Sequence, residues 1–283
     1  AVKVTGPGRM LMIMGTSGVH LVMGERLQTV EGMGGVVRDG IVPGLYGYEA
    51  GQTGFGDLFA WFVDHAVPPE YFDAAKKQGI HVHKVLENEA ARQKVGEHGL
   101  LALDWWNGNR STLVDADLTG LLIGATLATR APDIYRALLE AAAFGTRLII
   151  ETFERHGITA EELVLGGGLP EKNPLLVQIC ADVMGRTLQF SGTTQASALG
   201  AAIYAAVAAG LYPDVAAAAE KMGKLKPDVV KPSAANKAVY DRLYAEYKSL
   251  YDHFGRGQND VMKRLKSIKL EALTGHHAYL RPS

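Results

Sequence analysis

The segment from residue 162 to residue 185 constrains the fold more than any other part of the sequence. Residues 163–165 form a short apolar run typical of a buried strand, which ends abruptly at the glycines 166–168. Asn173 and Pro174 follow, a pair that suits the N-cap and the first position of a helix. Apolar residues then recur at the spacing of one helix face, at Leu176, Ile179, Cys180, Val183 and Met184. The segment predicts a strand, a glycine loop and a helix.

The glycine loop lets the backbone approach a ligand closely, because glycine carries no Cβ. The start of the following helix offers unpaired N–H groups and the positive end of a dipole, which suit a phosphate. Taken alone, the triplet fits equally well a tight turn whose glycines serve packing only. No Lys-Ser/Thr pair follows at P-loop spacing, and Glu171 stands where a dinucleotide-binding motif has its third glycine. A third type of nucleotide site is therefore predicted.

Strand and helix patterns alternate along most of the chain. We expect strands at residues 10–14, 20–23, 100–103 and 187–190, and helices from residue 57, at 80–97, 132–156 and 196–210, and after 232. The glycine-rich segment 32–56 is expected to form loops and short strands. Strands that alternate with long helices predict an α/β domain.

Composition excludes several classes of partner. The 283 residues carry a formal net charge of −1, so nothing in the sequence attracts nucleic acid or an acidic membrane. The single cysteine, Cys180, is expected to be a core residue. The sequence has no disulfide framework, signal peptide or long apolar run, which predicts a cytoplasmic protein. The histidines at 81, 83, 276 and 277 are expected on the surface, and no metal site is predicted.

Two polar turns are candidate ligand sites. The turn at residues 15–18, with Gly15 and Thr16, can donate backbone N–H groups and a hydroxyl to a phosphate. Alone it fits an ordinary hairpin better, but together with the glycine loop it predicts two jaws around one polyphosphate. Glu49 and Gln52 place a carboxylate and an amide in a glycine-rich segment, where they could hydrogen-bond a polyol. From the chemistry alone, Glu49 fits a solvated loop acid better.

The cluster at residues 104–110 combines Asp104, two adjacent tryptophans and Arg110, with Asp115 and Asp117 nearby. The tryptophan rings could stack on a sugar or a base, or they could wedge a domain interface or a subunit contact. The sequence leaves these alternatives open.

Several motifs together resemble the carboxy-terminal half of the FGGY carbohydrate kinases: MLMIMGTSG, GYEAGQ, LALDWWNGNRS, GGGLPEKNP and QASALGAAI. DWWNGNRS and GYEAGQ are typical of the ribulokinase branch of that family. The resemblance covers residues 1–265 and leaves 266–283 as a tail that we expect to be poorly ordered. It implies the actin/hexokinase-like (ribonuclease H-like) fold, of which this chain would be the second, ATP-binding domain.

The resemblance also implies site residues, matched position by position. Gly15 and Thr16 match the turn at the ATP phosphates, and Glu49 matches a carboxylate at the ketose hydroxyls. The nucleotide cleft and the loop that borders adenosine are matched by Gly56, Gly167, Gly168, Lys172 and Asn173. The implied cofactors are ATP and Mg²⁺, and the implied substrate is a ketopentose.

The family's general base, an Asp in an Asp-Ala-His motif, is not in this sequence. The amino-terminal domain, which supplies the magnesium-linked acid and most sugar contacts, is missing too, and the chain does not open with an initiator Met. We therefore expect a piece of a longer polypeptide that alone binds nucleotide weakly and lacks turnover. Asp104, Asp115 and Asp117 are the only clustered acids that could substitute for the general base. No match to the family supports that role, so no catalytic residue is assigned.

The resemblance implies that the parent enzyme phosphorylates the C5 hydroxyl of L-ribulose, in arabinose catabolism. One alternative keeps the family but changes the sugar to another ketose or polyol. Another is an actin-like nucleotide-binding scaffold that performs no chemistry. The expected partners are the sugar, ATP and the missing amino-terminal domain, and a homodimer is left open.

Overall fold

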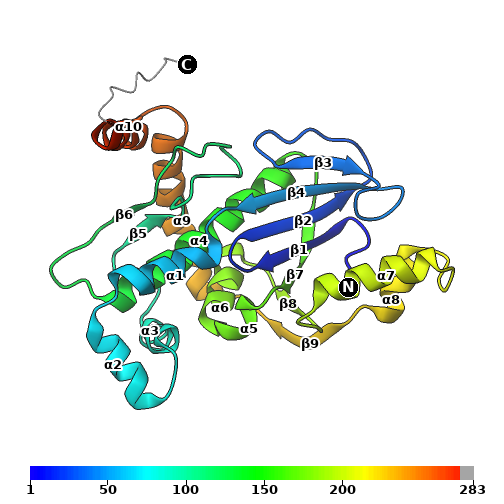
Figure 1. Ribbon diagram of the computed structural model, residues 1–283, viewed down its shortest axis with the longest axis horizontal. Helices are drawn as coiled ribbons and strands as arrows, with labels where there is room; N and C mark the ends of the chain where they lie inside the picture. Colours follow the sequence, from blue (N-terminus) through cyan, green and yellow to red (C-terminus); the bar gives the residue numbers. More distant parts are fainter. Residues whose placement is uncertain (275–283) are drawn as a thin grey trace.

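A mixed seven-stranded sheet forms the centre of the computed structural model, which describes residues 1–274 (Figure 1). Its strands run in the order β3 (Gly35–Arg38), β4 (Tyr46–Gln52), β2 (Gly18–Gly24), β1 (Gly8–Met14), β7 (Ala160–Gly166), β8 (Leu188–Ser191) and β9 (Leu225–Val230). The β1–β7 and β7–β8 pairs are parallel and the other pairs are antiparallel. β5 (Leu101–Leu103) and β6 (Leu121–Ile123) form a separate two-stranded sheet.

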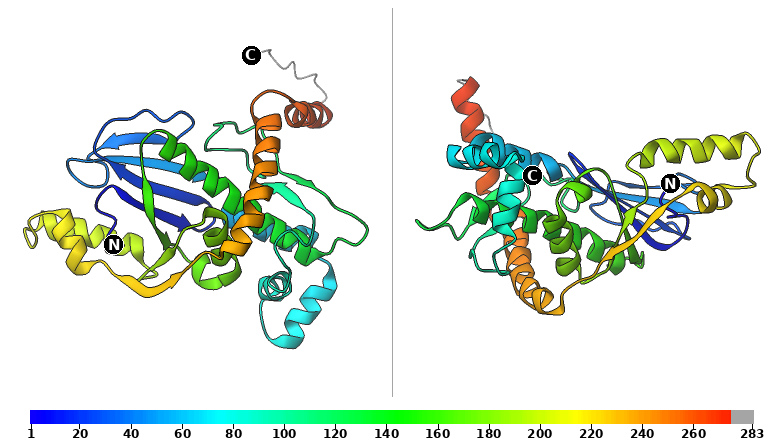
Figure 2. Two further views of the ribbon diagram at one scale, coloured as in Figure 1. Left: turned by 180° about the vertical axis from the view of Figure 1, so that it is seen from behind. Right: turned by 90° about the horizontal axis from the view of Figure 1, so that it is seen from below.

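The helices lie on both faces of the large sheet and beyond one end of it (Figures 1 and 2). They are α1 (Phe55–Ala66), α2 (Pro69–Gln78), α3 (Val82–Ala90), α4 (Ala131–Arg155), α5 (Leu169–Lys172), α6 (Pro174–Met184), α7 (Ala196–Ala208), α8 (Val215–Met222), α9 (Ala234–Gly255) and α10 (Val261–Thr274). Helix α4 packs against α6, α3 and α1, and α9 packs against α6. This is the expected α/β architecture.

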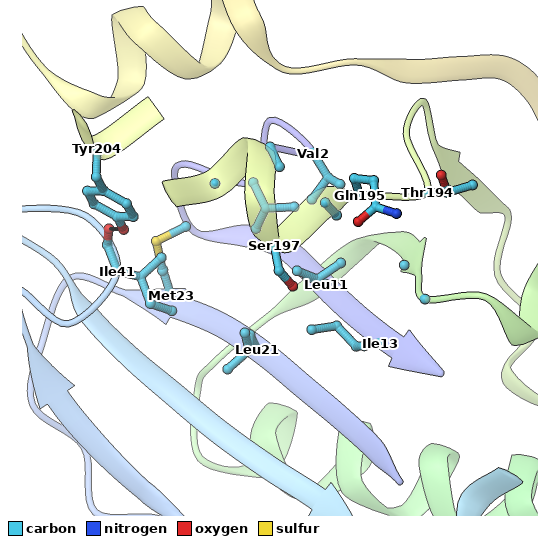
Figure 3. Close-up of a pocket in the computed structure, with 16 residues that line it drawn as sticks. Val2, Leu11, Ile13, Leu21, Met23, Ile41, Thr194, Gln195, Ser197 and Tyr204 are labelled. Atoms are coloured by element: carbon cyan, nitrogen blue, oxygen red, sulfur yellow. Dashed lines mark hydrogen bonds between the residues drawn. The ribbon is translucent and has the colours of Figure 1, made fainter. Parts of the chain in front are cut away.

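Strand β1 separates two different environments, because its side chains alternate between the sheet faces. Met10, Met12 and Met14 are fully buried in the main core, to which α4 and α6 contribute. Leu11 and Ile13 point the other way and line a cavity of about 340 Å³ beneath α7 (Figure 3). Burying each methionine stabilises the fold by roughly 1.5–3 kcal/mol, whereas Leu11 and Ile13 on the other face are only partly buried.

A buried polar network crosses the main core at Gln52. The Gln52 side chain accepts hydrogen bonds at Oε1 from Thr146 (2.8 Å) and from the ring of His20 (3.1 Å). It donates from Nε2 to Asp104 Oδ2 (2.8 Å) and to the backbone oxygen of Ala142 (3.0 Å). Tyr247 of α9 donates to the other oxygen of Asp104 at 3.0 Å. All the hydrogen-bonding capacity of the Gln52 amide is used, so the network ties β2, β4, α4 and α9 together.

Most of the expected elements are present, with several differences. The helix expected over 80–97 ends at Ala90, because turns follow in which Gly96 and Gly99 adopt positive φ. No separate element was expected for α2, α5, β6, α8 or β9. Residues 266–274, expected to belong to a poorly ordered tail, continue α10, whose Met262 is buried and whose Lys266 pairs with Asp117. Residues 275–283, including His276 and His277, lie outside the described residues.

Gly145 makes room for the polar network, and replacing it should destabilise the protein. A Cβ there would lie 2.6 Å from Gln52 Nε2 and 2.8 Å from Asp104 Oδ2. Gly145→Ala should therefore lower the free energy of unfolding by about 2 kcal/mol, although alanine is the better helix former. Gly200→Ala in α7 is the matched control, because a Cβ there meets nothing within 4 Å; it should raise stability by up to about 1 kcal/mol. Urea denaturation gives the free energy of unfolding of both variants. Equal changes in the two variants would contradict the proposed clash at Gly145.

His20 should make the fold sensitive to acid. Burial lowers the pKa of His20 from 6.5 to about 4, partly opposed by the hydrogen bond to Gln52. The unfolded chain therefore takes up this proton at a higher pH than the folded chain, and stability falls as the pH drops from 6.5 towards 4. The loss amounts to on the order of 3 kcal/mol. His20→Gln should flatten the stability profile in this window, whereas His65→Gln at an exposed position should leave the profile unchanged.

Candidate functional site

The turn at residues 15–18 is braced by the start of α1. The backbone N–H of Gly56 donates to the carbonyl oxygen of Gly15 at 2.9 Å, and Asp57 N–H donates to the Thr16 oxygen at 3.2 Å. A Cβ at Gly56 would lie 2.5 Å from the Gly15 oxygen, so only glycine permits this contact. The structure therefore brings Gly56 directly against the turn that holds Gly15 and Thr16.

The glycine loop lies next to the same turn. Strands β1 and β7 are parallel neighbours with Ile13 opposite Gly166, so the loops that follow them leave the same edge of the sheet. Gly167 has a φ of +90°, and a Cβ there would clash with the carbonyl oxygen of Met14. Gly168 has a φ of −90° and faces open space, with nothing within 4 Å of an added Cβ. The two predicted bends thus meet at the carboxyl end of β1.

A cavity of about 480 Å³ opens beside this meeting point. Its lining brings together three of the predicted site residues, Gly56, Lys172 and Asn173. Phe59, Tyr135 and Leu169 supply the apolar walls, and His81, His83, Lys84 and Glu87 complete the lining. A mostly apolar cavity with a few placed polar groups is typical of a small-molecule site. Sequence analysis missed the contribution of α3, because nothing local to His81 or His83 indicates that they face residues far along the chain.

The polar groups of this cavity form a chain of contacts. Asn173 Nδ2 donates to the Tyr135 hydroxyl at 3.3 Å, and that hydroxyl lies 3.2 Å from Nδ1 of His83. Burial, followed by the neighbouring His81, lowers the pKa of His83, which keeps its ring neutral at pH 7. The His81 and His83 rings stack with centroids 5.2 Å apart. Planar rings and neutral hydrogen-bonding groups suit a heterocyclic base and its ribose better than they suit a phosphate.

The expectation that the start of α6 offers free N–H groups to a phosphate is wrong. Asn173 is the N-cap as predicted, and its Oδ1 accepts from Leu176 N–H at 2.9 Å. The buried carboxylate of Glu87 accepts from Leu175 N–H at 3.2 Å, and Pro174 has no N–H to offer. These groups are already paired, and Glu87 itself forms an ion pair with Lys84 at 2.8 Å, so these N–H groups are not free to bind an anion. The turn at 15–18 is the remaining phosphate candidate.

Glu49 lies apart from the cavity, on β4. It pairs with Leu21 across the β2–β4 ladder, three positions along from the pair of Gly18 with Gln52. Its side chain is 42% exposed and forms an ion pair with Arg110 at 2.5 Å. The structure therefore places Glu49 on the strand that leads back to the turn at 15–18, with its carboxylate accessible from outside.

The acids of the tryptophan cluster are engaged within the fold. Asp104 belongs to the buried network, and burial raises the pKa of its carboxyl group. Asp115 and Asp117 form ion pairs with Lys263 (2.8 Å) and Lys266 (2.6 Å) of α10. Among the described residues, no group of three or more His, Cys, Asp or Glu side chains is placed to hold a metal ion. These contacts give none of the three aspartates the position of a replacement general base.

Two other expectations are resolved by the packing. Trp105 is buried with its ring against Tyr251 of α9 at a centroid distance of 5.1 Å, so it serves an internal contact and not ligand stacking. Cys180 is fully buried, as expected, and burial raises the pKa of its thiol to about 12. Within residues 1–274, no helix has the length and apolar character needed to cross a membrane.

Comparison with known proteins agrees with this geometry. The C-terminal domain model of the FGGY family of carbohydrate kinases matches residues 10–209. Proteins named ribulokinase from Halalkalibacterium halodurans and Anoxybacillus flavithermus are 55% and 56% identical to this chain over 95% of it, and the matches cover 48% of each relative. The chain thus spans about half the length of the curated relatives it matches.

A solved structure shows the same fold. The xylulose kinase from Rhodospirillum rubrum is 25% identical, with a TM-score of 0.72 over 88% of this chain and 47% of that chain. This likeness confirms the expected actin/hexokinase-like fold. The match of the family model over most of the sequence establishes the membership: the chain belongs to the FGGY family of carbohydrate kinases, as its C-terminal domain.

Proposed function

We propose that this chain is the nucleotide-binding half of an ATP-dependent carbohydrate kinase whose substrate is L-ribulose. The observation that carries the proposal is the cavity lined by Gly56, Lys172 and Asn173, next to the turn of Gly15 and Thr16. The sugar is inferred from the relatives that bear the name ribulokinase. The product would be L-ribulose 5-phosphate, made in the cytoplasm for arabinose catabolism.

In this proposal each predicted residue has one task. Adenosine occupies the cavity, bordered by Gly167, Gly168, Lys172 and Asn173, and the phosphates extend towards Gly15 and Thr16. The Thr16 hydroxyl and the backbone N–H groups of that turn other than that of Gly15, which donates to the Ser17 oxygen at 3.1 Å, would hold the phosphates. Mg²⁺ bound with ATP would neutralise part of their charge. Glu49 would accept hydrogen bonds from the sugar hydroxyls.

The general base would come from an Asp-Ala-His motif just upstream of the first strand of this chain. The magnesium-linked acid and the remaining sugar contacts would come from an amino-terminal domain, since the relatives are about twice as long. This domain is the main proposed protein partner, and a homodimer stays a further prediction. A second candidate function keeps the reaction but changes the sugar, because the solved relative at 25% identity is named a xylulose kinase. A scaffold without chemistry would have no use for the half-exposed carboxylate of Glu49.

Nucleotide binding tests the cavity assignment. Gly168→Val should weaken ADP binding by about tenfold or more without lowering the melting temperature, because its φ is ordinary and the space around it is open. Asn173→Ser keeps a capping oxygen but removes the amide donor, and should weaken binding by about fivefold. Titration calorimetry of this chain with ADP measures both effects.

Gly6→Val is the matched control, since a Cβ at Gly6 also meets nothing within 4 Å. It should bind ADP as the unchanged chain does. Unaltered affinity in both Gly168→Val and Asn173→Ser would remove the nucleotide from this cavity.

Sugar kinetics test Glu49. In the full-length protein, Glu49→Gln should raise KM for L-ribulose by about tenfold and leave KM for ATP within about twofold, because a charge-assisted hydrogen bond to one substrate is lost. Steady-state kinetics with each substrate varied in turn give both constants. A larger change in KM for ATP than in KM for L-ribulose would show that Glu49 does not contact the sugar.

A further inference from the structure

The tryptophan loop, residues 104–111, is hydrogen-bonded along strand β4 and the residue that follows it. Asp104 accepts from Gln52, and Ser111 Oγ accepts from Gly51 N–H at 3.2 Å. The Thr53 hydroxyl contacts the carbonyl oxygens of residues 107 and 108, at 2.8 and 3.1 Å. The loop therefore lies alongside residues 51–53, where β4 ends and where Gln52 pairs with Gly18 of the turn at 15–18. These hydrogen bonds hold this end of β4 in position.

The back of the loop is anchored in the core. Trp105 packs against Tyr251, and Trp106 contacts Trp61 of α1 at a centroid distance of 5.5 Å. Arg110 is left on the outside of the loop, with a side chain that is 45% exposed. A long cationic side chain mounted on an anchored loop loses less conformational freedom on binding than one on a mobile loop.

Gly51 leaves room for the Arg110 guanidinium, and Gly34 lies nearby. A Cβ at Gly51 would come within 3.2 Å of Arg110 Nη1 and 3.3 Å of its Cδ. A Cβ at Gly34 would lie 3.8 Å from Nη2. The guanidinium therefore rests against the backbone of β4, beside Glu49, in a space that larger residues would narrow.

Arg110 pairs with only one of the two carboxylate oxygens of Glu49. Arg110 Nη2 donates to Oε1 at 2.5 Å, while Oε2 accepts no hydrogen bond from a side chain or backbone within residues 1–274. A carboxylate oxygen has room for further donors. The two half-exposed side chains together carry no net charge, so an uncharged ligand with hydroxyl donors fits the pair better than a cation or an anion.

We propose that Arg110 is a positioning residue of the sugar site. It holds Glu49 Oε1, leaves Oε2 to accept a hydroxyl of the substrate, and balances the Glu49 charge, so that the site selects neutral ketoses or polyols over amino-sugars. This role rests on the proposed contact of Glu49 with the sugar. In this proposal the tryptophan loop has a function, because it carries Arg110, whose guanidinium orients the Glu49 carboxylate towards the sugar.

Stability alone is a weak reason for such a pair, since exposed ion pairs contribute about 0–1 kcal/mol. The molecule contains a matched example in Arg9 and Glu162, which pair at 2.6 Å with side chains 39% and 57% exposed. That pair joins β1 and β7 and lies at the opposite end of both strands from the turn at 15–18. It therefore separates the effect of losing a surface ion pair from the effect of losing this one.

The test uses the full-length protein and four variants: Arg110→Met, Arg110→Lys, Arg9→Met and Glu49→Gln. Arg110→Met should raise KM for L-ribulose by about two- to fivefold, the size expected for a solvent-exposed charge pair, with KM for ATP unchanged. Arg110→Lys should restore most of the sugar affinity, because the charge is kept. Arg9→Met should leave both constants unchanged.

An amino-deoxy analogue of the ketose provides a readout that a purely structural role would not move. Arg110→Met leaves Glu49 unpaired, so the inhibition constant of the cationic analogue should fall relative to KM for L-ribulose, by about threefold or more. Calorimetric titration of the sugar and of the analogue gives the same ratio without turnover.

The outcomes distinguish a failure of the proposed contact between Glu49 and the sugar from a failure of the role proposed for Arg110. If Glu49→Gln leaves sugar affinity unchanged, the proposed contact of Glu49 with the sugar fails. If Glu49→Gln weakens the sugar but Arg110→Met behaves like Arg9→Met, only the role of Arg110 is overturned. Equal losses of sugar and analogue affinity in Arg110→Met, with a lowered melting temperature, would also overturn it, because they indicate a general distortion of β4.

Discussion

Around residues 14–16 three segments of the chain pack backbone against backbone, and the rest of the site depends on that contact. Gly56 donates to the carbonyl of Gly15, and Gly167 lies against the carbonyl of Met14. A Cβ at Gly56 or Gly167 would lie 2.5 Å or less from a carbonyl oxygen, so a side chain at either position would force the segments apart. The glycines therefore determine how close the turn, α1 and the glycine loop can come.

Strand β4 connects this contact to the core and to Glu49. The last residue of β4, Gln52, makes four side-chain hydrogen bonds in the main core. The intervening Gly51 is bonded to the tryptophan loop, and Glu49 faces outwards to Arg110. Because side chains alternate along a strand, the same element can be fixed on its inner face and present a carboxylate on its outer face. The hydrogen bonds on the inner face hold β4 in place and so give the Glu49 carboxylate on the outer face a defined position.

What the sequence predicts well here is local. The cap at Asn173, the apolar face of α6 and the buried run of β1 are set by neighbouring residues, and each is present. The pairing of Leu175 N–H with Glu87 joins residues 88 positions apart, and no pattern near either residue announces it. The same applies to Arg110 with Glu49, 61 positions apart, and to Trp105 with Tyr251. Motif resemblance supplied the predicted site residues, whereas their contact partners depend on how segments distant in the sequence pack together.

The arrangement also explains why a second domain belongs to the proposed function. Gly168 faces open space, and Glu49 and Arg110 are each exposed by nearly half. Nucleotide and sugar bound to these groups would be contacted from one side and would keep water on the other. In water the interaction of such charges with a ligand is weak, and a bound triphosphate remains open to hydrolysis. Covering the open side would strengthen every electrostatic contact on this half and exclude water from the reacting phosphate. In the proposed function, the half-exposed groups of this chain would therefore form one wall of a site that a second domain completes.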